Sequence, residues 1–342
     1  MEELKFDRYT AIREIGRGGA AVVYEAVHQG LGTRHALKLL SVQSDAVRKR
    51  MMNEARLQAQ LKHPNLVAVT DVFEVDNRPV VILDLIDGPT LERWLIDEGL
   101  PDYDEAERIF RGIVAGVAAA HAKGVVHRDL KPANVLLEGP DLQPRVTDFG
   151  LAKALAVKTG ETRMGVAMGT PGYMAPELIG HAATADERAD VFSLGCILYA
   201  MVGGAIPFGA DTVLASLNRT AEGDYVPLDE LVPDAPDHLV DTVHACLQTS
   251  RDDRPSTCAA VLALLEPAIR GEPLPLNPST PPPGVSAPPP EPEDEDERPP
   301  PSMRRVAGAL LLLAGMALLA WMSDAFLQPE PAPPTTTLPG ER

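Results

Sequence analysis

The segment Val126–Asn134 places three complementary side chains within five positions of one another. Asp129 offers a carboxylate, Lys131 an ammonium group and Asn134 a carboxamide. A further carboxylate, Asp148, follows Asn134 by fourteen residues and begins an Asp-Phe-Gly tripeptide. Carboxylate and amide oxygens can bind Mg²⁺, and an ammonium group can neutralise a phosphate. The set therefore fits phosphoryl transfer, in which a hydroxyl is oriented, a phosphate is neutralised and a metal is held.

A glycine-rich segment near the N-terminus could approach a phosphate group. The stretch 15–24 contains Gly16, Gly18 and Gly19, and glycines let backbone amides reach phosphate oxygens without an intervening side chain. Strand-like sequence flanks the stretch on both sides, whereas a dinucleotide fingerprint would open a helix. No Gly-Lys-Ser or Gly-Lys-Thr follows, so it is not a P-loop of the ATPase type. Taken alone, the stretch could equally be an ordinary hairpin turn.

Lys38 and Glu54 carry opposite charges on neighbouring expected elements. Lys38 ends an apolar strand, and Glu54 lies in the middle of the helix that follows. A pair between them could aim the ammonium group at phosphates. Alternatives stay open for each residue alone: Lys38 as a solvated strand end, and Glu54 as a surface residue that pairs with Arg50, four positions earlier.

The first 87 residues are expected to form a small sheet with one helix. Strand-like runs rich in β-branched residues occupy 9–15, 22–27, 35–39, 66–74 and 79–85. A helix is expected over 45–61. It ends before His63-Pro64, because a proline disfavours helix in the residue ahead of it.

After residue 87 the pattern becomes helical. The longest apolar-periodic helix is expected over 105–123, with Gly124 as its C-terminal stop. Further helices are expected over 190–202, 212–221, 236–248 and 257–268. This change of character predicts two lobes with a cleft between them.

Together these segments resemble the eukaryotic-like (Hanks-type) protein kinases, and specifically the bacterial serine/threonine kinases of that group. The resemblance covers about residues 9–270 and rests on motifs in the family's order. They are the glycine-rich loop, Lys38, Glu54, His127-Arg128-Asp129, Asn134, Asp148-Phe149-Gly150, Ala175-Pro176-Glu177, Asp190 with Ser193-Leu194-Gly195, and Arg254. It implies an α+β bilobal protein kinase fold, with an N-lobe over 1–87 and a C-lobe over 88–271.

The resemblance also implies ATP and Mg²⁺ as cofactors, with Mn²⁺ as an alternative metal, and a role for each motif residue. Asp129 would orient the acceptor hydroxyl or accept its proton, and Lys131 would neutralise the γ-phosphoryl group. Lys38, held by Glu54, would contact the α- and β-phosphates, while Asn134 and Asp148 would bind the metal. The remaining nucleotide contacts would come from a phosphate-covering loop (Gly16, Arg17, Gly18, Gly19, Ala20, Ala21 and Val23), a hinge (Leu83, Asp84 and Ile86) and a purine-sandwiching pair (Ala36 and Leu136).

Two details imply that the acceptors are serine and threonine hydroxyls of proteins. They are Lys131, two residues after the catalytic aspartate, and Thr170, in a Gly-Thr-Pro sequence ahead of Ala-Pro-Glu. Arg128 implies control by phosphorylation of the activation segment 148–177, where a phosphate would pair with it. Thr159 and Thr162 are the candidate sites, and Thr162 is preferred because it lies nearer the part that docks. Each could also be an ordinary polar loop residue.

Composition excludes several other classes of protein. The formal net charge of -18 argues against nucleic acid as a partner, because its backbone needs a basic face. The three cysteines, Cys196, Cys246 and Cys258, are widely separated, so neither a disulfide framework nor a cysteine zinc site is expected. The charged N-terminus has no apolar run behind it, which indicates that no signal peptide is present.

The C-terminal region predicts attachment to a membrane. Residues 272–303 are proline-rich and acidic, and we expect a disordered linker. Arg304 and Arg305 then precede the uncharged segment Val306–Ser323, which as a helix would span about 27 Å, near the ~30 Å of a bilayer core. Positive residues before the segment and Asp324 after it indicate a single-pass inner (plasma) membrane protein with a cytoplasmic kinase domain and a short outer tail over 324–342.

Two functional hypotheses follow. The first is an active, membrane-anchored serine/threonine protein kinase that autophosphorylates its activation segment, in trans within a transient homodimer. The second is a binding protein with a kinase fold that recruits partners through its proline-rich linker. The intact set of motifs favours the first.

Overall fold

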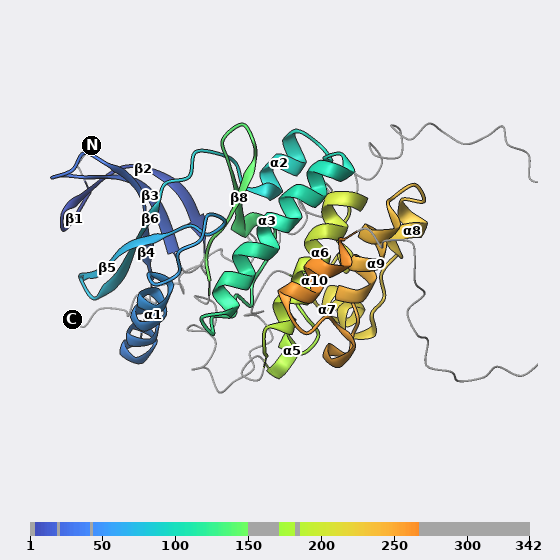
Figure 1. Ribbon diagram of the computed structural model, residues 1–342. Coiled ribbons are helices and arrows are strands. Elements are labelled where there is room, and N and C mark those ends of the chain that lie inside the picture. The colour runs from blue at the N-terminus through green and yellow to red at the C-terminus, as the bar shows by residue number, and fades with distance from the viewer. Residues whose placement is uncertain (1–3, 19–20, 42–43, 150–170, 182–184, 267–342) are drawn as a thin grey trace, which may run out of the picture.

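The structure, a computed structural model, describes residues 4–18, 21–41, 44–149, 171–181 and 185–266 (Figure 1). The candidate linker 272–303, membrane segment 304–323 and tail 324–342 lie outside the described residues. Among the residues that the structure does describe, no helix is both long enough and apolar enough to cross a membrane.

The N-terminal lobe is an antiparallel sheet with a helix beside it (Figure 1). Its strands lie in the order β1-β2-β3-β4-β6-β5. They are β1 (Lys5–Phe6), β2 (Tyr9–Gly18), β3 (Ala21–His28), β4 (Arg34–Leu40), β5 (Val69–Val75) and β6 (Arg78–Asp84). The helix, α1 (Asp45–Gln58), packs mainly against β5 and β6.

Alternation along β6 builds two apolar clusters on opposite faces of this sheet. Val80 and Ile82 pack with Leu37 in one cluster, whereas Val81 and Leu83 pack with residues of α1 in the other. Successive side chains of a strand point to opposite faces, so a continuous apolar run is what a strand covered on both sides requires. The sheet is therefore held between α1 and the β1–β2 side of the lobe.

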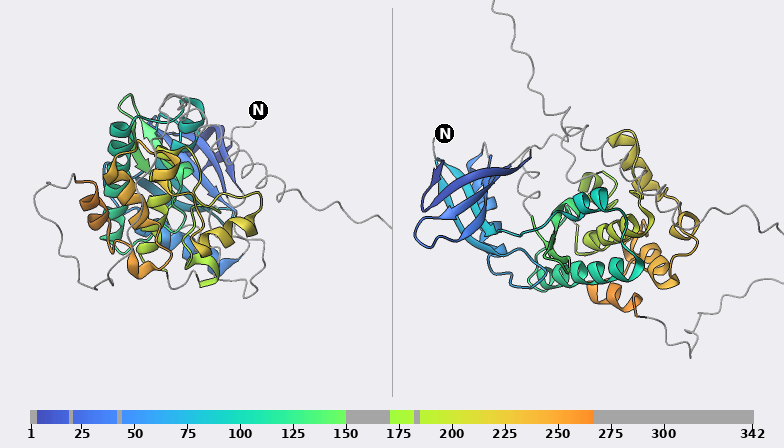
Figure 2. Two further views of the ribbon diagram at one scale, coloured as in Figure 1. Left: turned by 90° about the vertical axis from the view of Figure 1, so that its right-hand side faces the viewer. Right: turned by 90° about the horizontal axis from the view of Figure 1, so that it is seen from above.

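The C-terminal lobe is built around α6 (Arg188–Gly203), which is buried along nearly its whole length. Its sequence is mostly apolar around the whole helix, as expected for a helix at the centre of a domain. α3 (Tyr103–His121), α8 (Leu228–Leu231) and α9 (Asp237–Cys246) pack against it (Figure 2). The other elements of this lobe are α2 (Leu91–Asp97), η1 (Pro132–Asn134), β7 (Val135–Glu138), β8 (Gln143–Val146), α5 (Leu178–His181), α7 (Val213–Glu222), η3 (Arg251–Asp253) and α10 (Cys258–Leu264).

The two-lobed α+β architecture expected from the sequence is confirmed. Some boundaries differ: the helix expected over 45–61 ends at Gln58, and the strand expected over 66–74 begins only at Val69. α2 and the β7–β8 hairpin were not predicted. Seven helical residues, or two strands of four, are too short for hydrophobic periodicity to identify them.

The chain that leaves β6 passes very close to β7 at Gly88. A Cβ atom on Gly88 would lie 1.8 Å from the carbonyl oxygen of Leu137, so only glycine fits there. The next residue, Pro89, accepts the N–H of Leu137 at 2.9 Å, and Thr90 forms a bridge with Leu136. These contacts place the start of α2 beside the strand that follows the 126–134 loop.

Candidate active site

Asp129, Lys131 and Asn134 converge in the loop between α3 and β7. Asn134 Nδ2 donates to the main-chain carbonyl of Asp129 at 2.8 Å and lies 3.4 Å from its Oδ2. Lys131 Nζ lies 3.3 Å from the same Oδ2. Lys131 directly precedes η1, whose proline at the start favours the tight turn that folds Asn134 back toward Asp129. The structure thus brings together the three side chains that the sequence singled out first.

Asp190, on α6, holds the backbone of this loop. It is fully buried, and its carboxylate accepts the N–H of His127 at 2.7 Å and that of Arg128 at 2.8 Å. Arg128 has a φ of 67°, which residues other than glycine rarely adopt, and the two hydrogen bonds stabilise that conformation. Burial alone would raise the pKa of Asp190, but the hydrogen bond from His121 and the nearby His127 hold the pKa below its usual value. The carboxylate therefore stays charged where it is needed as an acceptor.

His127 connects the catalytic loop with the segment that carries Asp148. Its Nδ1 accepts the N–H of Asp129 at 3.3 Å, so its Nε2 carries the proton and donates to the carbonyl of Thr147 at 2.8 Å. The ring of Phe149 lies 4.6 Å from the His127 ring, centroid to centroid. His127 therefore joins the two segments through hydrogen bonds and ring packing.

Lys38 and Asp148 form an ion pair between the lobes. Lys38 Nζ lies 2.6 Å from Asp148 Oδ1. Burial would raise the pKa of Asp148, but the Lys38 ammonium more than offsets this and the pKa lies below its usual value. Asp148 also has a positive φ, 66°, which marks a backbone conformation held by its surroundings.

Between Lys38 and Glu54, both within the described residues, no ion pair is observed. Among the described residues, Lys38 pairs with Asp148. The alternative pair of Glu54 with Arg50 is not observed there either. Glu54 is carried on α1, which packs mainly against β5 and β6, whereas Lys38 lies on β4. Asp148 is therefore the carboxylate that the Lys38 ammonium contacts.

Gln58, at the end of α1, makes a contact that its sequence pattern did not predict. Its buried amide Nε2 donates to the main-chain carbonyl of Phe149. The helix is thereby tied to the Asp-Phe-Gly segment. The spacing in the sequence could have indicated this contact, because Gln58 follows Glu54 by four residues and both therefore lie on the same side of α1.

The predicted nucleotide-binding residues lie on the strands of the N-terminal lobe and on β7. They are Gly16, Arg17 and Gly18 at the end of β2, Ala21 and Val23 on β3, Ala36 on β4, Leu83 and Asp84 on β6, Ile86 beyond it, and Leu136 on β7. Gly19 and Ala20 lie outside the described residues. Gly18 pairs with Ala21, and Val23 pairs with Lys38. The glycine-rich hairpin therefore runs beside the strand that carries the lysine.

Asn134 and Asp148 fit a magnesium ion by their chemistry. The main-chain carbonyl of Asn134 accepts the N–H of Thr147 at 3.0 Å, which brings Asn134 beside Asp148. Because its Nδ2 donates to Asp129, its amide oxygen is left to face a metal. Mg²⁺ is commonly held by one or two carboxylates together with substrate phosphates, so a larger protein donor set is not required. Within the described residues, no group of three or more His, Cys, Asp or Glu side chains could hold a metal.

The Arg128 guanidinium group has N–H donors that no described residue accepts. Its Nη2 donates to the carbonyl of Ala185 at 3.1 Å, while its buried Nε and Nη1 have no partner among the described residues. Leaving such groups unpaired is costly, and a guanidinium group suits an anion with several oxygens. The three threonines assigned regulatory roles, Thr159, Thr162 and Thr170, lie outside the described residues.

Glu177 and Arg254 anchor the segment that approaches the catalytic loop from the other side. Arg254 Nη1 and Nη2 each lie 2.8 Å from a carboxylate oxygen of Glu177, and its guanidinium carbon lies 4.9 Å from the centroid of the Phe192 ring. Ser193 Oγ donates to the carbonyl of Tyr173 at 2.8 Å. Residues 171–177 are thereby fastened to α6 and to the loop before α10.

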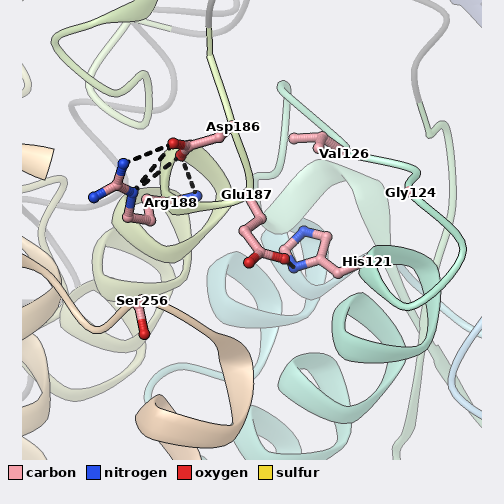
Figure 3. Close-up of a pocket in the computed structure, with 7 residues that line it drawn as sticks. All are labelled: His121, Gly124, Val126, Asp186, Glu187, Arg188 and Ser256. Atoms are coloured by element: carbon pink, nitrogen blue, oxygen red, sulfur yellow. Dashed lines mark hydrogen bonds and ion pairs between the residues drawn. The ribbon is translucent and has the colours of Figure 1, made fainter. Parts of the chain in front are cut away.

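A cavity of about 420 Å³ lies next to the catalytic loop (Figure 3). Its lining consists of His121, Gly124, Val126, Asp186, Glu187, Arg188 and Ser256. His121 donates toward Asp190, 2.7 Å away, while its Nδ1 lies 3.6 Å both from Glu187 and from the Cys258 thiol. Burial raises the pKa of that thiol to about 12, so it is not a reactive nucleophile at neutral pH.

Comparisons with known proteins agree with this geometry. Residues 9–264 match the family model described as the protein kinase domain. The chain is 35% identical over 241 residues to the probable serine/threonine-protein kinase PknB of Lactococcus lactis subsp. lactis, an alignment that covers 69% of this chain and 38% of the relative. It is 34% identical over 262 residues to the serine/threonine-protein kinase PknL of Mycobacterium bovis, covering 76% of this chain and 65% of the relative. The chain thus spans between about a third and two thirds of the length of these relatives.

A solved structure shows the same arrangement of elements. The crystal structure of Rad53 1-466 in complex with AMP-PNP has a TM-score of 0.64 and 26% sequence identity to this chain. The match covers 75% of this chain and 65% of that chain.

Proposed function

The chain belongs to the protein kinase domain family, and we propose that it is an active serine/threonine kinase of the bacterial Hanks type that transfers the γ-phosphoryl group of ATP to protein hydroxyls. One observation carries the proposal. The Asp129, Lys131 and Asn134 cluster and the ion pair of Lys38 with Asp148 are tied together through His127 and Thr147. The groups that such a transfer needs are therefore held in one place by two lobes.

Asp129 receives the proton of the acceptor. As the hydroxyl oxygen of serine or threonine bonds to the γ-phosphorus, the bond from that phosphorus to the β–γ bridging oxygen breaks and ADP leaves. The hydroxyl proton passes to the Asp129 carboxylate. Lys131, 3.3 Å from that carboxylate, supplies positive charge beside the oxygens of the transferred group.

Lys38, Asn134 and Asp148 act on the nucleotide. Lys38 orients the α- and β-phosphates, while Ala36 and Leu136 offer half-buried apolar contacts to the purine. Mg²⁺ bound by Asn134 and Asp148 would offset the charge of the phosphate oxygens. The similar Rad53 structure contains AMP-PNP, which supports ATP as the donor.

Serine and threonine are proposed as acceptors on two grounds. The relatives that the chain matches are serine/threonine-protein kinases by name. Lys131 and Thr170 occupy the positions that carry this preference in the family, as the sequence resemblance implies.

Autophosphorylation of the activation segment is proposed as the control step. The unpaired Nε and Nη1 of Arg128 support it, because a phosphate on Thr162 or Thr159 would provide charged acceptors for them. A transient homodimer would let one copy modify the next. Phosphosite mapping of the purified chain tests this step, and an activation segment without phosphate in a fully active enzyme would contradict it.

Membrane anchoring is a separate part of the proposal. Its support is the sequence alone: the uncharged segment 306–323, preceded by two arginines and by a proline-rich acidic stretch. The kinase lobes would then lie at the cytoplasmic face of the inner membrane and phosphorylate protein substrates there. Deleting 304–342 should move the protein to the soluble fraction, and an unchanged membrane fraction would refute the anchor.

The central test is phosphoryl transfer by the purified full chain. With radiolabelled ATP and Mg²⁺, the wild type should label itself and a generic protein substrate on threonine or serine, and Asp129→Asn should abolish both signals. Nucleotide binding without transfer to any protein would instead support the alternative of a kinase-fold scaffold.

A further inference from the structure

The cavity of about 420 Å³ beside the catalytic loop takes no part in the proposed phosphoryl transfer (Figure 3). Its size is ordinary for a site that binds a small ligand. Two of its lining residues, Gly124 and Ser256, are exposed, so a ligand can reach it from solvent. Val126, which directly precedes His127, also lines it. An occupant of the cavity would therefore touch the start of the catalytic loop.

One ring nitrogen of His121 is a hydrogen-bond acceptor at this cavity. The His121 side chain is only 5% exposed, and its Nε2 lies 2.7 Å from Oδ2 of the buried Asp190. Because that carboxylate accepts, Nε2 carries the proton, and in the neutral ring Nδ1 keeps a lone pair. The Cys258 thiol, 3.6 Å from Nδ1, is only a weak donor to it. Nδ1 is therefore incompletely satisfied.

A second acceptor lies beside this nitrogen. Glu187 Oε2 is 3.6 Å from His121 Nδ1, and the two side chains point toward each other in Figure 3. That distance is too long for a hydrogen bond. No described residue donates a hydrogen bond to the Glu187 carboxylate, whose side chain is 39% exposed. A lone pair and a carboxylate at this separation repel each other unless a donor bonds to both.

The N–H donors around the cavity are already used within the fold. The Arg188 guanidinium lies 2.8 Å from Asp186 Oδ2 and 2.6 Å from Asp252 Oδ1. The main-chain N–H of Arg188 donates to Asp186 Oδ1 at 3.0 Å, and the next two N–H groups of α6 donate to the carbonyls of Asp186 and Glu187. The start of this helix therefore lacks the free N–H groups with which other helices bind anions. What the cavity offers a ligand is acceptors.

We propose that this cavity binds a primary alkylammonium group, which donates hydrogen bonds to the Glu187 carboxylate and to Nδ1 of His121. An ammonium nitrogen about 2.9 Å from each acceptor fits between two atoms that lie 3.6 Å apart. Its three N–H donors can turn to meet both acceptors, and its charge neutralises that of Glu187. The cavity is larger than an ammonium group, and Val126 offers an apolar contact to the alkyl chain.

The bound ammonium group would act on the catalytic loop through His121. A donor at Nδ1 strengthens the hydrogen bond that Nε2 donates to Asp190, because hydrogen bonds in a chain polarise one another. Asp190 in turn accepts the N–H groups of His127 and Arg128. An occupied cavity should therefore hold this backbone more firmly. The inference goes beyond the proposed kinase function and does not depend on it.

Isothermal titration calorimetry on the purified full chain tests the site. The probes are putrescine and N-acetyl-lysine amide, which share the ammonium group and distinguish a free amine from the lysine side chain of a partner. The neutral control is n-butanol. At least one amine should bind saturably, and n-butanol should bind about tenfold more weakly or less, a difference expected for hydrogen bonds to a charged group. The amine that binds more tightly identifies the source of the ligand.

Three variants locate the binding. Glu187→Gln removes the charge and should weaken amine binding about tenfold or more. Ser256→Lys supplies an ammonium group from the rim of the cavity, so neither probe should bind. Glu222→Gln changes an exposed glutamate at the end of α7 and should leave the affinity as in the wild type.

Hydrogen exchange of the full chain tests the connection to the catalytic loop. Saturation with the bound amine should slow exchange of the His127 and Arg128 amides about threefold or more, because opening of this backbone becomes less frequent. The same amine concentration should leave exchange unchanged in Glu187→Gln.

Two competing explanations need no ligand. Glu187 could serve only to place a negative charge at the N-terminus of α6, where such a charge is favourable. A second proton on the His121 ring could instead pair with Glu187 directly, and its charge would repel an ammonium group. Both explanations predict that neither amine binds.

The outcomes decide between these explanations and the proposed site. Absence of saturable amine binding, equal binding of n-butanol, or an affinity that Glu187→Gln leaves unchanged would overturn the site. Amine binding without slower exchange at His127 and Arg128 would overturn the connection to the catalytic loop. Phosphoryl transfer is measured separately, so none of these results decides the kinase function.

Discussion

The Lys38 ammonium lies 2.6 Å from the Asp148 carboxylate, although 110 positions separate the two residues in the sequence. Lys38 belongs to β4 of the sheet lobe, and Asp148 follows β8 in the helical lobe. The contact therefore spans the junction at which nucleotide and metal are proposed to bind. It also brings the lysine to a carboxylate other than the one that the sequence suggested.

Lys38→Met and Asp148→Asn should each lower phosphoryl transfer by at least about a hundredfold, because each removes a charge placed at the phosphates. Radiolabelled transfer to a protein substrate measures this. Lys49, exposed on α1, provides a matched control, and Lys49→Met should retain wild-type activity. Undiminished activity in Asp148→Asn would contradict the assigned metal-binding role.

Asp190→Ala should destabilise the protein by about 3–5 kcal/mol. The substitution leaves the main-chain N–H groups of His127 and Arg128, and the buried His121 ring, without their hydrogen-bond acceptor. Urea unfolding with an unchanged m value measures the loss. Asp241, exposed on α9, is the control, and Asp241→Ala should change stability by no more than about 0.5 kcal/mol. A small effect at Asp190 would show that the catalytic loop holds its conformation without this carboxylate.

The pair of Glu177 with Arg254 should show strong coupling. Arg254 has no exposed side-chain surface, so Arg254→Met or Glu177→Gln alone leaves a buried group without its partner and should cost about 3–5 kcal/mol. The double variant should cost clearly less than the sum, since neither charge is then left alone. Chemical denaturation of the wild type, the two single variants and the double variant gives the coupling energy between the two side chains. Simple additivity would mean that the two side chains act independently.

Glu92→Gln should raise thermal stability near neutral pH, because it removes a charge that burial disfavours. Burial raises the pKa of Glu92 in the folded state above its usual value, so the folded protein binds this proton more readily than the unfolded chain. Stability relative to the variant is then lost as pH rises through the raised pKa, and it returns as pH falls toward the unfolded value. Melting curves of the two proteins from acid to neutral pH should converge at the acid end. A variant that is less stable than the wild type at neutral pH would indicate a structural role for Glu92.

The sequence by itself determined the chemistry and its order along the chain. Asp129, Lys131, Asn134 and Asp148 are recognisable by type and spacing, and the change from strand-like to helical patterns predicted the two lobes. Such features are local, because each depends on residues a few positions apart. For the same reason, the apolar segment 306–323 could be identified from hydropathy alone, and it stays a prediction.

Only the tertiary structure decided which of these side chains meet. Lys38 contacts Asp148, 110 positions away in the sequence, because the two lobes meet between β4 and the segment after β8. Asp190 reaches the catalytic loop because α6 runs through the centre of its lobe, and α2 begins beside β7 because Gly88 lets the chain pass close to Leu137. Contacts of this kind join residues far apart in the chain, and their energies depend on burial and on competing partners. Sequence spacing records neither of these quantities.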